Sequence, residues 1–523
     1  MIKRKEQLKA INTTTRWDVV IIGGGASGLG AAVDAASRGF STILFEAEDF
    51  AKGTSSRSTK LVHGGVRYLA QGHLTMVREA LKERGLLAKN AAHLFKNQQF
   101  AIPLYRWWQR LYYRIGLALY DTLAGRLSIG KTALISSKKM TERLPNLISD
   151  KLSGGLTYHD GQFDDSRLAI NLAQTAIRSG ATVINYMKVI DLRKDTNERL
   201  TGVVVFDKET AQEYLVHSKV IINATGVFSN AIMNLDGKKK YNFKIVPSQG
   251  VHLVVDASFL GGTNALMIPK TKDGRVLFAL PWHGKLLMGT TDTPIEGQPY
   301  EPTALEVEID FILDTAAHYL KKKPTRGDVL SVFAGLRPLV ATIGEKKKTK
   351  EIPRGHKIIV SESGLISILG GKWTTYRLMA ETLINTAIQH HGLENKPCVT
   401  KELSIYGNVN TSLCTSSHEY MYGSEILKVR NLISQHLDYQ QKIHPRYHYK
   451  VGEVIWFARY EMARTVEDIL ARRIRLLFLD AKAAIEAAPM VAKVLARELN
   501  RDADWVQQQE KAFGSLAKNY LLR

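Results

Sequence analysis

Three glycines near the start of the chain have the spacing of a dinucleotide-binding motif. Gly23, Gly25 and Gly28 fit the pattern G-x-G-x-x-G. In this motif the first glycine permits a tight turn, the second lets a pyrophosphate approach the backbone, and the third lets the helix pack close to the strand. Glu46 follows where a carboxylate can accept hydrogen bonds from a ribose. The pattern predicts dinucleotide binding, and the alternative is a glycine-rich turn in an ordinary α/β domain.

The elements that must position these residues can be read from the flanking sequence. Residues 19–22 form a short apolar run, which is typical of a buried parallel strand. A helix is expected after Gly28, with Gly39 where a helix C-cap belongs. Residues 41–45 predict a second strand that ends just before Glu46.

Two later segments repeat the arrangement of a strand that ends in a small-residue turn. Residues 220–224 form an apolar run that is soon followed by Gly226. A strand near 364 leads into Gly370 and Gly371, and a helix is expected to start near Thr374. Such turns let a backbone approach a cofactor, and a helix N-terminus offers N–H groups to an anion or a flavin carbonyl. Each turn alone could simply close a loop, but together they predict a cofactor lying across one sheet.

The composition indicates a large globular protein with an anionic partner. The chain has 523 residues, enough for two or three domains, and a formal net charge of +22. This charge indicates nucleic acid, acidic lipid or a phosphorylated substrate, and the lack of nucleic-acid motifs argues against the first. Cys398 and Cys414 form no C-x-x-C pair, so we expect neither a disulfide framework nor a metal site. No secretory signal or membrane-spanning run is predicted.

Motifs from about residue 17 to 480 resemble those of the FAD-dependent glycerol-3-phosphate dehydrogenases, in the flavoprotein superfamily that includes D-amino-acid oxidase. The resembling segments are GGGASGLGAA, GTSSRSTKLVHGGVRYL, NATG, SQGVHLVV, LPWHGKLLMGTTD, FAGLRPL, GGKWTTYR and TVEDILARRIRLLFLD. The segments TSSRSTKLVHGGVRYL and GGKWTTYR are far more specific than the glycine pattern.

The resemblance implies an α/β fold in which a Rossmann-like FAD-binding domain is interleaved with an antiparallel-sheet substrate domain. We expect these two domains within residues 17–390, with the substrate part at roughly 76–150 and 241–330. An all-α C-terminal domain is expected at 391–523, and its helices could support a homodimer. The Arg472–Arg473 pair in that domain is interpreted as solvated.

The resemblance also implies a reaction, the oxidation of sn-glycerol 3-phosphate to dihydroxyacetone phosphate. The C2 hydrogen leaves as hydride to the flavin, the C2 hydroxyl loses a proton, and reduced FAD passes electrons to a membrane quinone. Related oxidases use oxygen and commonly carry an added internal segment, which is not seen here. The alternatives are a glycerol-3-phosphate oxidase, a related amine or hydroxy-acid flavin oxidase, and a non-catalytic flavin-binding protein.

A dianionic phosphate requires convergent cations, and arginine offers a bidentate fork. The residues that match pocket positions of the family are Arg67, Arg337 and Lys372, each of which lies beside glycines or apolar residues. Tyr68 is a further candidate for a hydrogen bond to the substrate. The alternative for any single Arg or Lys is a solvated charge.

Histidine is the expected proton acceptor because its ordinary pKa lies near neutral pH. His63 and His252 both match family positions near the active site, and the sequence does not decide between them. A neighbouring cation would keep such a histidine neutral and would stabilise a developing alkoxide. Arg337 is the candidate for that role.

The resemblance also assigns contacts to FAD along the chain. The expected cofactor-binding residues are Gly23, Gly25, Gly28, Glu46, Thr54, Ser55, Ser56, Lys60, Val189, Gly226, Gly371, Lys372, Trp373 and Thr374.

Residues 104–120 bear on the location of the protein. Arg106, Arg110 and Arg114 recur every four residues, and aromatic and aliphatic residues cover much of the rest of this predicted helix. The pattern is typical of an interfacial helix, although a core helix with one wet face is the alternative. With the positive net charge, it predicts a cytoplasmic protein bound peripherally to the anionic inner face of the cytoplasmic membrane.

Overall fold

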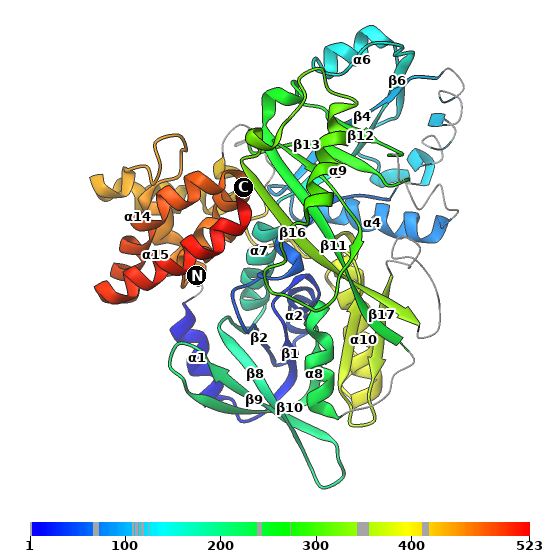
Figure 1. Cartoon of the computed structure of the whole chain (residues 1–523). Coiled ribbons are helices and arrows are strands. Elements are labelled where there is room, and N and C mark those ends of the chain that lie inside the picture. Colours follow the sequence, from blue (N-terminus) through cyan, green and yellow to red (C-terminus); the bar gives the residue numbers. More distant parts are fainter. Residues whose placement is uncertain are drawn as a thin grey trace.

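Figure 1 shows a computed structural model of the chain, with two sheets and a group of C-terminal helices that pack side by side. The structure describes residues 3–65, 73–106, 125–237, 243–271, 274–342, 355–409 and 418–522, together with part of 107–124. Arg67, Tyr68 and Cys414 lie outside the described residues, as does most of the predicted interfacial helix.

The first sheet has eight strands and forms the lower part of the molecule in Figure 1. Its strands are β1 (Trp17–Ile22), β2 (Thr42–Phe45), β7 (Thr182–Ile184), β8 (Met187–Lys194), β9 (Leu200–Asp207), β10 (Glu213–Asn223), β17 (His356–Val360) and β18 (Ile366–Gly370). The main order is β17-β18-β10-β1-β2-β7, with β8 and β9 joined to it through β10. β1 lies between β2 and β10 and is parallel to both, so their carboxyl ends meet at one edge.

The second sheet has ten strands and lies above the first in Figure 1. Its strands are β3 (Leu61–Val62), β4 (Phe95–Leu104), β5 (Ala133–Ile135), β6 (Gly154–Phe163), β11 (Phe243–Asp256), β12 (Ala265–Ile268), β13 (Leu277–Trp282), β14 (Lys285–Gly289), β15 (Thr293–Pro294) and β16 (Ser331–Thr342). All of its printed pairs are antiparallel except β4 with β12. β6 and β16 extend this sheet beyond the two ranges expected for the substrate part.

Helices cover both sheets and make up the last part of the chain. They are α1 (Arg4–Thr13), α2 (Ala26–Ser37), α4 (Leu74–Asn90), α6 (Ser137–Arg143), α7 (Asp165–Arg178), α8 (Ser229–Asp236), α9 (Glu306–Ala317), α10 (Tyr376–His391), α11 (Ile426–Ser434), α12 (Val451–Tyr460), α13 (Leu476–Leu479), α14 (Ala481–Leu499) and α15 (Ala503–Ala517). A π-helical turn, η11, spans Asp468–Arg473. Within the described part of the chain, no helix is long and apolar enough to cross a membrane.

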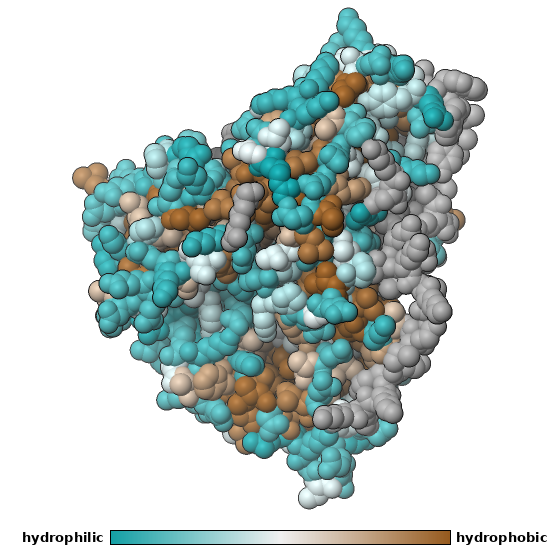
Figure 2. Space-filling model, viewed as in Figure 1, coloured by the Kyte–Doolittle hydropathy of each residue, from teal (hydrophilic) through white to brown (hydrophobic). Residues whose placement is uncertain are grey.

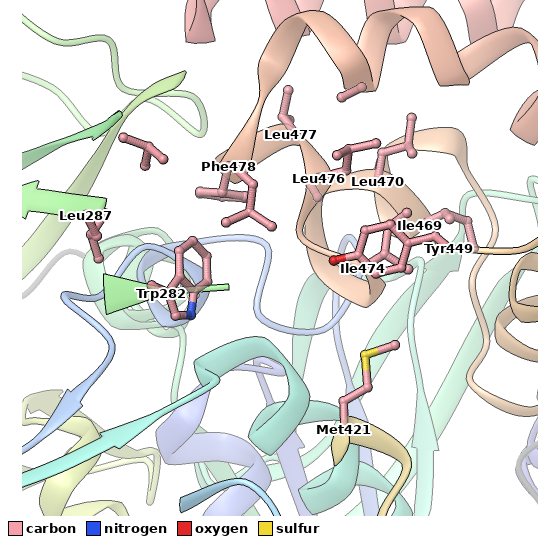
Figure 3. Packing of buried hydrophobic residues seen from close by; sticks show 14 of the residues in the cluster. Trp282, Leu287, Met421, Tyr449, Ile469, Leu470, Ile474, Leu476, Leu477 and Phe478 are labelled. Carbon is pink, nitrogen blue, oxygen red and sulfur yellow. The ribbon is translucent and has the colours of Figure 1, made fainter. Parts of the chain in front are cut away.

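The C-terminal helices share a hydrophobic core with the second sheet. Trp282 and Leu287 from the sheet are buried in the same cluster as Leu477 and Phe478 from α13, and Figure 3 shows Trp282 lying next to Phe478. The ring of Phe478 meets Phe333 of β16 edge to face at a centroid distance of 4.8 Å. Burial of such apolar surface is the dominant favourable term in packing, so the two parts are held together firmly.

Buried arginines of the same C-terminal part reach into the loop that follows β2. The Asp49 carboxylate accepts hydrogen bonds from Arg472 at 2.6 Å and from Arg473 at 2.8 and 3.0 Å. All three side chains are at most 2% exposed. Although burial disfavours the charged form, Arg473 and Arg472 lower the pKa of Asp49 to about 2. The interpretation of the arginine pair as solvated was therefore wrong, because both guanidinium groups neutralise a buried carboxylate from a distant segment.

This contact predicts a large loss of stability when one guanidinium is removed. Arg473→Met should lower the free energy of unfolding by about 3 kcal/mol, because it leaves Asp49 buried with an incomplete set of partners. The exposed pair between Lys89 and Glu402 provides the control. Lys89→Ala should cost less than about 1 kcal/mol, because both groups are well solvated. Urea denaturation of the two variants tests the difference, and equal losses would contradict the prediction.

Candidate functional site

A cavity of 510 Å³ lies at the carboxyl ends of β1, β2 and β10, where α2 begins. This is the edge of a parallel sheet at which α/β folds bind ligands. The predicted cofactor residues that line it are Gly23, Gly25, Glu46, Thr54, Ser55, Val189, Gly226, Gly371, Lys372 and Trp373. The surface over β8 and α8, which carry further lining residues, includes a hydrophobic area in the lower part of Figure 2. The structure therefore brings residues from six separate stretches of the chain to one cavity.

The glycine turn can exist only without side chains at two of its positions. Gly23 has a φ of +111°, and a Cβ there would lie 2.7 Å from the Ala224 carbonyl oxygen. A Cβ on Gly28 would lie 1.9 Å from the Gly23 carbonyl oxygen. Since real atoms do not approach so closely, the turn requires glycine for its conformation at one position and for close packing at the other. These are the two roles that the sequence pattern predicts.

Glu46 forms part of the cavity wall and is fixed by backbone amides. Its carboxylate accepts hydrogen bonds from Gly24 N at 2.5 Å and from Glu48 N at 2.9 Å. Burial raises the pKa of Glu46 to about 7, against the effect of these two hydrogen bonds. The side chain therefore lies where the dinucleotide pattern predicts an acceptor for the ribose.

Four segments are tied together in the wall of the cavity. Trp373, in the turn after β18, donates from its indole nitrogen to the Ser55 carbonyl at 2.9 Å. Thr54 Oγ1 donates to the Leu336 carbonyl of β16 at 2.6 Å, and Ser55 Oγ accepts from Ala26 N at 3.0 Å. The 54–55 segment is thus bonded to α2, to β16 and to the 370–374 turn, which gives the cavity a fixed wall.

Lys60 lies behind this wall and does not line the cavity. Its ammonium is fully buried and donates to the Ser56 carbonyl at 2.7 Å and to Asp165 at 2.6 Å. Burial and the nearby Arg475 lower the pKa of Lys60 to about 7 despite the ion pair with Asp165. Arg475 also donates to the Ser56 carbonyl, at 2.9 Å. Ser56 and Lys60 therefore support the cavity loop from behind.

A second, smaller cavity of 130 Å³ lies on the other side of β16. Its polar lining residues are Thr59, His63, Asp160, Arg275, Thr290, Thr291, Asp292 and Arg337. Arg337 lines this cavity, whereas its neighbour Pro338 lines the larger one. Successive side chains of a strand point to opposite faces, so one strand forms a wall of both cavities.

The guanidinium of Arg337 is held by several acceptors at the edge of the second cavity. It donates to the Thr291 and Gln249 carbonyls at 3.1 and 3.3 Å and to Thr290 Oγ1 at 3.0 Å. Asp292 lies 3.8 Å away. These contacts fix the direction of the Arg337 side chain. The side chain is 20% exposed and lines the cavity.

The two candidate histidines occupy different places. His63 lines the second cavity, and its backbone N–H donates to Thr374 Oγ1 at 3.3 Å. His252 lies deeper, 2% exposed and stacked on Phe333, with its Nε2 atom 3.0 Å from Thr59 Oγ1. Burial lowers the pKa of His252 well below its usual range, and the nearby Lys60 and Arg337 cations act in the same direction. His252 is therefore neutral, and it is connected to the cavity through Thr59.

The sequence reasoning missed Arg275 and Asp160, which also line the second cavity. Arg275 follows the turn after β12, and its guanidinium packs over the Phe311 ring at 4.3 Å. In the sequence it stands in an ordinary polar turn, TKDGR, and this gives no signal of a site. Its place in the lining depends on the pairing of β12 with β4 and β13.

Comparisons with known proteins agree with this geometry. The family model described as FAD dependent oxidoreductase matches residues 18–377. The chain belongs to this family. The model for the C-terminal domain of alpha-glycerophosphate oxidase matches residues 365–506. The predicted family, fold class and FAD cofactor are thereby confirmed, and the residues of the larger cavity fit a dinucleotide cofactor such as FAD.

Individual relatives carry a more specific name. The chain is 39% identical to the mitochondrial glycerol-3-phosphate dehydrogenase of Homo sapiens, over 97% of this chain and 74% of that protein. It is 37% identical to the mitochondrial enzyme of Saccharomyces cerevisiae, over 95% of this chain and 89% of that protein. A solved structure of the Bacillus halodurans glycerol-3-phosphate dehydrogenase complexed with FAD aligns with a TM-score of 0.82 at 28% identity, covering 100% and 99% of the two chains.

The glycine geometry predicts the effect of one added methyl group on cofactor binding. Gly28→Ala should weaken FAD binding at least about tenfold, because its Cβ collides with the Gly23 carbonyl and must displace the turn. Gly514→Ala in α15 is the control, since its Cβ would meet no atom within 4 Å. Quenching of flavin fluorescence on titration of the apoprotein gives both affinities. Unchanged affinity in Gly28→Ala would contradict the assignment of the turn.

Proposed function

We propose that the protein oxidises sn-glycerol 3-phosphate to dihydroxyacetone phosphate and passes the electrons to a membrane quinone. The observation that carries the proposal is the pair of cavities that share β16 as a wall. One fits FAD, and the other is small and is lined by apolar side chains together with polar groups that include two arginines. The names of relatives that share 37–39% of their residues with this chain support the same substrate.

The phosphate is assigned to the two arginine side chains of the smaller cavity. Arg337 and Arg275 both line it, and arginine forks match the geometry of a phosphate dianion. Arg67 and Tyr68 are proposed to complete the clamp from the segment after His63. Lys372, which lines the larger cavity at the 370–374 turn, is proposed to face both groups.

The proton of the C2 hydroxyl is assigned to His63, because His63 lines the cavity whereas His252 reaches it only through Thr59. His252 then acts by orienting the Thr59 hydroxyl, which itself lines the cavity. Arg337 offers a fixed positive charge near the developing alkoxide. FAD, when bound, supplies the two-electron acceptor for the C2 hydrogen.

A peripheral position on the membrane is proposed for the delivery of electrons to a quinone. It is supported by the net charge of +22 and by the alternation of arginine and aromatic residues at 104–120. The proposed location is the cytoplasmic side, at the inner face of the cytoplasmic membrane.

Anaerobic reduction of the bound flavin tests the substrate directly. Addition of sn-glycerol 3-phosphate to the holoenzyme should bleach the flavin absorption band at about 450 nm, and a quinone analogue should restore it. The enantiomer, sn-glycerol 1-phosphate, is the matched control and should bleach the flavin far more slowly. No bleaching by either compound would refute the proposed substrate. Rapid reoxidation by oxygen with formation of peroxide would refute the proposed acceptor and indicate an oxidase.

Substitution of each histidine separates the proposed base from its neighbour. His63→Asn should lower kcat for flavin reduction by about 100-fold or more, because it removes the proton acceptor. His252→Asn should have a smaller effect of about tenfold or less, because the Thr59 hydroxyl still lines the cavity. Stopped-flow reduction of FAD-loaded variants gives both rates. A larger loss in His252→Asn than in His63→Asn would reverse the assignment.

A further inference from the structure

A buried polar cluster lies behind the second cavity and does not belong to the proposed clamp. It consists of Arg84 from α4, Tyr120 from the end of the 104–120 segment, and Asp160 from β6, and each is at most 2% exposed. Tyr120 donates its hydroxyl proton to Asp160 Oδ2 at 2.7 Å, and Arg84 Nη1 donates to Asp160 Oδ1 at 3.0 Å. Buried polar groups of this kind are costly unless each has its partner, so the geometry of the cluster is tightly specified.

The Tyr120 hydroxyl has a second bond, to the backbone beside the proposed base. It accepts the N–H of Gly64 at 2.9 Å, and Gly64 directly follows His63. A phenol hydroxyl has one proton, which is given to Asp160, so the bond from Gly64 must use an oxygen lone pair. The hydrogen bonds therefore run in one direction, from Gly64 to Tyr120 and from Tyr120 to Asp160.

The shape of the turn gives independent evidence of the same contact. A Cβ on Gly64 would lie 2.5 Å from the Tyr120 hydroxyl oxygen and 2.4 Å from a methyl carbon of Leu81. The backbone at Gly64 therefore packs directly against Tyr120, with no space for a side chain at position 64. The preceding amide, that of His63, is bonded to Thr374, so two consecutive amides of the turn are fixed by residues from two different segments.

The cluster also touches the wall of the cavity itself. Asp160 lines the cavity together with His63, and Tyr158, a further lining residue, meets the Tyr120 ring edge to face at 6.3 Å. Arg84 neutralises the Asp160 carboxylate, and its guanidinium lies 6.0 Å from the centre of the Tyr120 ring. A carboxylate that faces an anionic substrate would otherwise repel it.

We propose that Tyr120 is a positioning residue of the substrate site, which acts by holding the Gly64 amide and thereby the direction of the His63 side chain. Asp160 fixes the Tyr120 hydroxyl, and Arg84 keeps the charge of Asp160 balanced. The inference rests on the proposed function of His63 as the proton acceptor. It assigns a role to the end of the 104–120 segment that is separate from any contact with a membrane.

The test compares two tyrosine-to-phenylalanine variants of the full-length holoenzyme. Tyr120→Phe removes the acceptor of the Gly64 amide, whereas Tyr105→Phe removes a hydroxyl that donates to the Ile148 carbonyl, away from the cavity. In Tyr120→Phe, hydrogen–deuterium exchange of the Gly64 amide should rise about tenfold or more, because the amide loses its partner. Flavin reduction per bound FAD should slow about tenfold or more through kcat, because a small displacement of a reacting group is costly. Tyr105→Phe should leave both quantities unchanged.

The two readouts separate this inference from the proposed function. Exchange at Gly64 requires no substrate, so it tests the hydrogen bond even if glycerol 3-phosphate fails to reduce the flavin. Unchanged exchange at Gly64 in Tyr120→Phe would overturn the inference, as would a loss of turnover that only matches a loss of bound FAD. Asp160→Asn is a second variant that keeps an oxygen acceptor for Tyr120. It should raise exchange at Gly64 less than Tyr120→Phe does, and the reverse order would also overturn the inference.

Discussion

The burial of Asp49 is the constraint on which the arrangement of the domains depends. A carboxylate without water is stable only when cations surround it, and here the cations are Arg472 and Arg473 from the C-terminal part. The same loop continues into the 51–55 segment that forms a wall of the FAD cavity. Arg475 extends the contact by bonding the Ser56 carbonyl. The C-terminal domain is therefore a structural component of the cofactor site, although none of its described residues lines the cavity.

The long strand β16 gives the site its second organising feature. Its long antiparallel ladder with β11 fixes the register from Phe243 opposite Thr342 to Val254 opposite Ser331. This register directs Arg337 toward the smaller cavity and Pro338 toward the larger one. A slip of one residue would exchange the two faces. The register of this ladder therefore determines which side chains of β16 line each cavity.

The sequence predicted the glycine turn of the site, where the backbone leaves no room for a side chain. Gly23 and Gly28 were identifiable because the turn has no room for other residues, and the fold class followed from the motifs around them. Arg472 and Arg473 were misread because a charged pair in a helical segment usually faces water, and only the distant Asp49 makes their burial favourable. Arg275 gave no local signal, because its place in the cavity depends on strand pairing between segments far apart in the chain. Periodicity and motifs report local requirements, whereas these contacts are properties of the assembled fold.

The separation of Asp49 from its arginine partners in the chain has a consequence for biosynthesis. Asp49 and Arg473 are 424 positions apart, so a ribosome that adds about 5–20 residues per second finishes the loop long before its partners exist. During that interval Asp49 has no arginine partner, so its burial in the loop is unfavourable. Capture of the flavin is thus expected to be a late event, which follows the synthesis of Arg472 and Arg473.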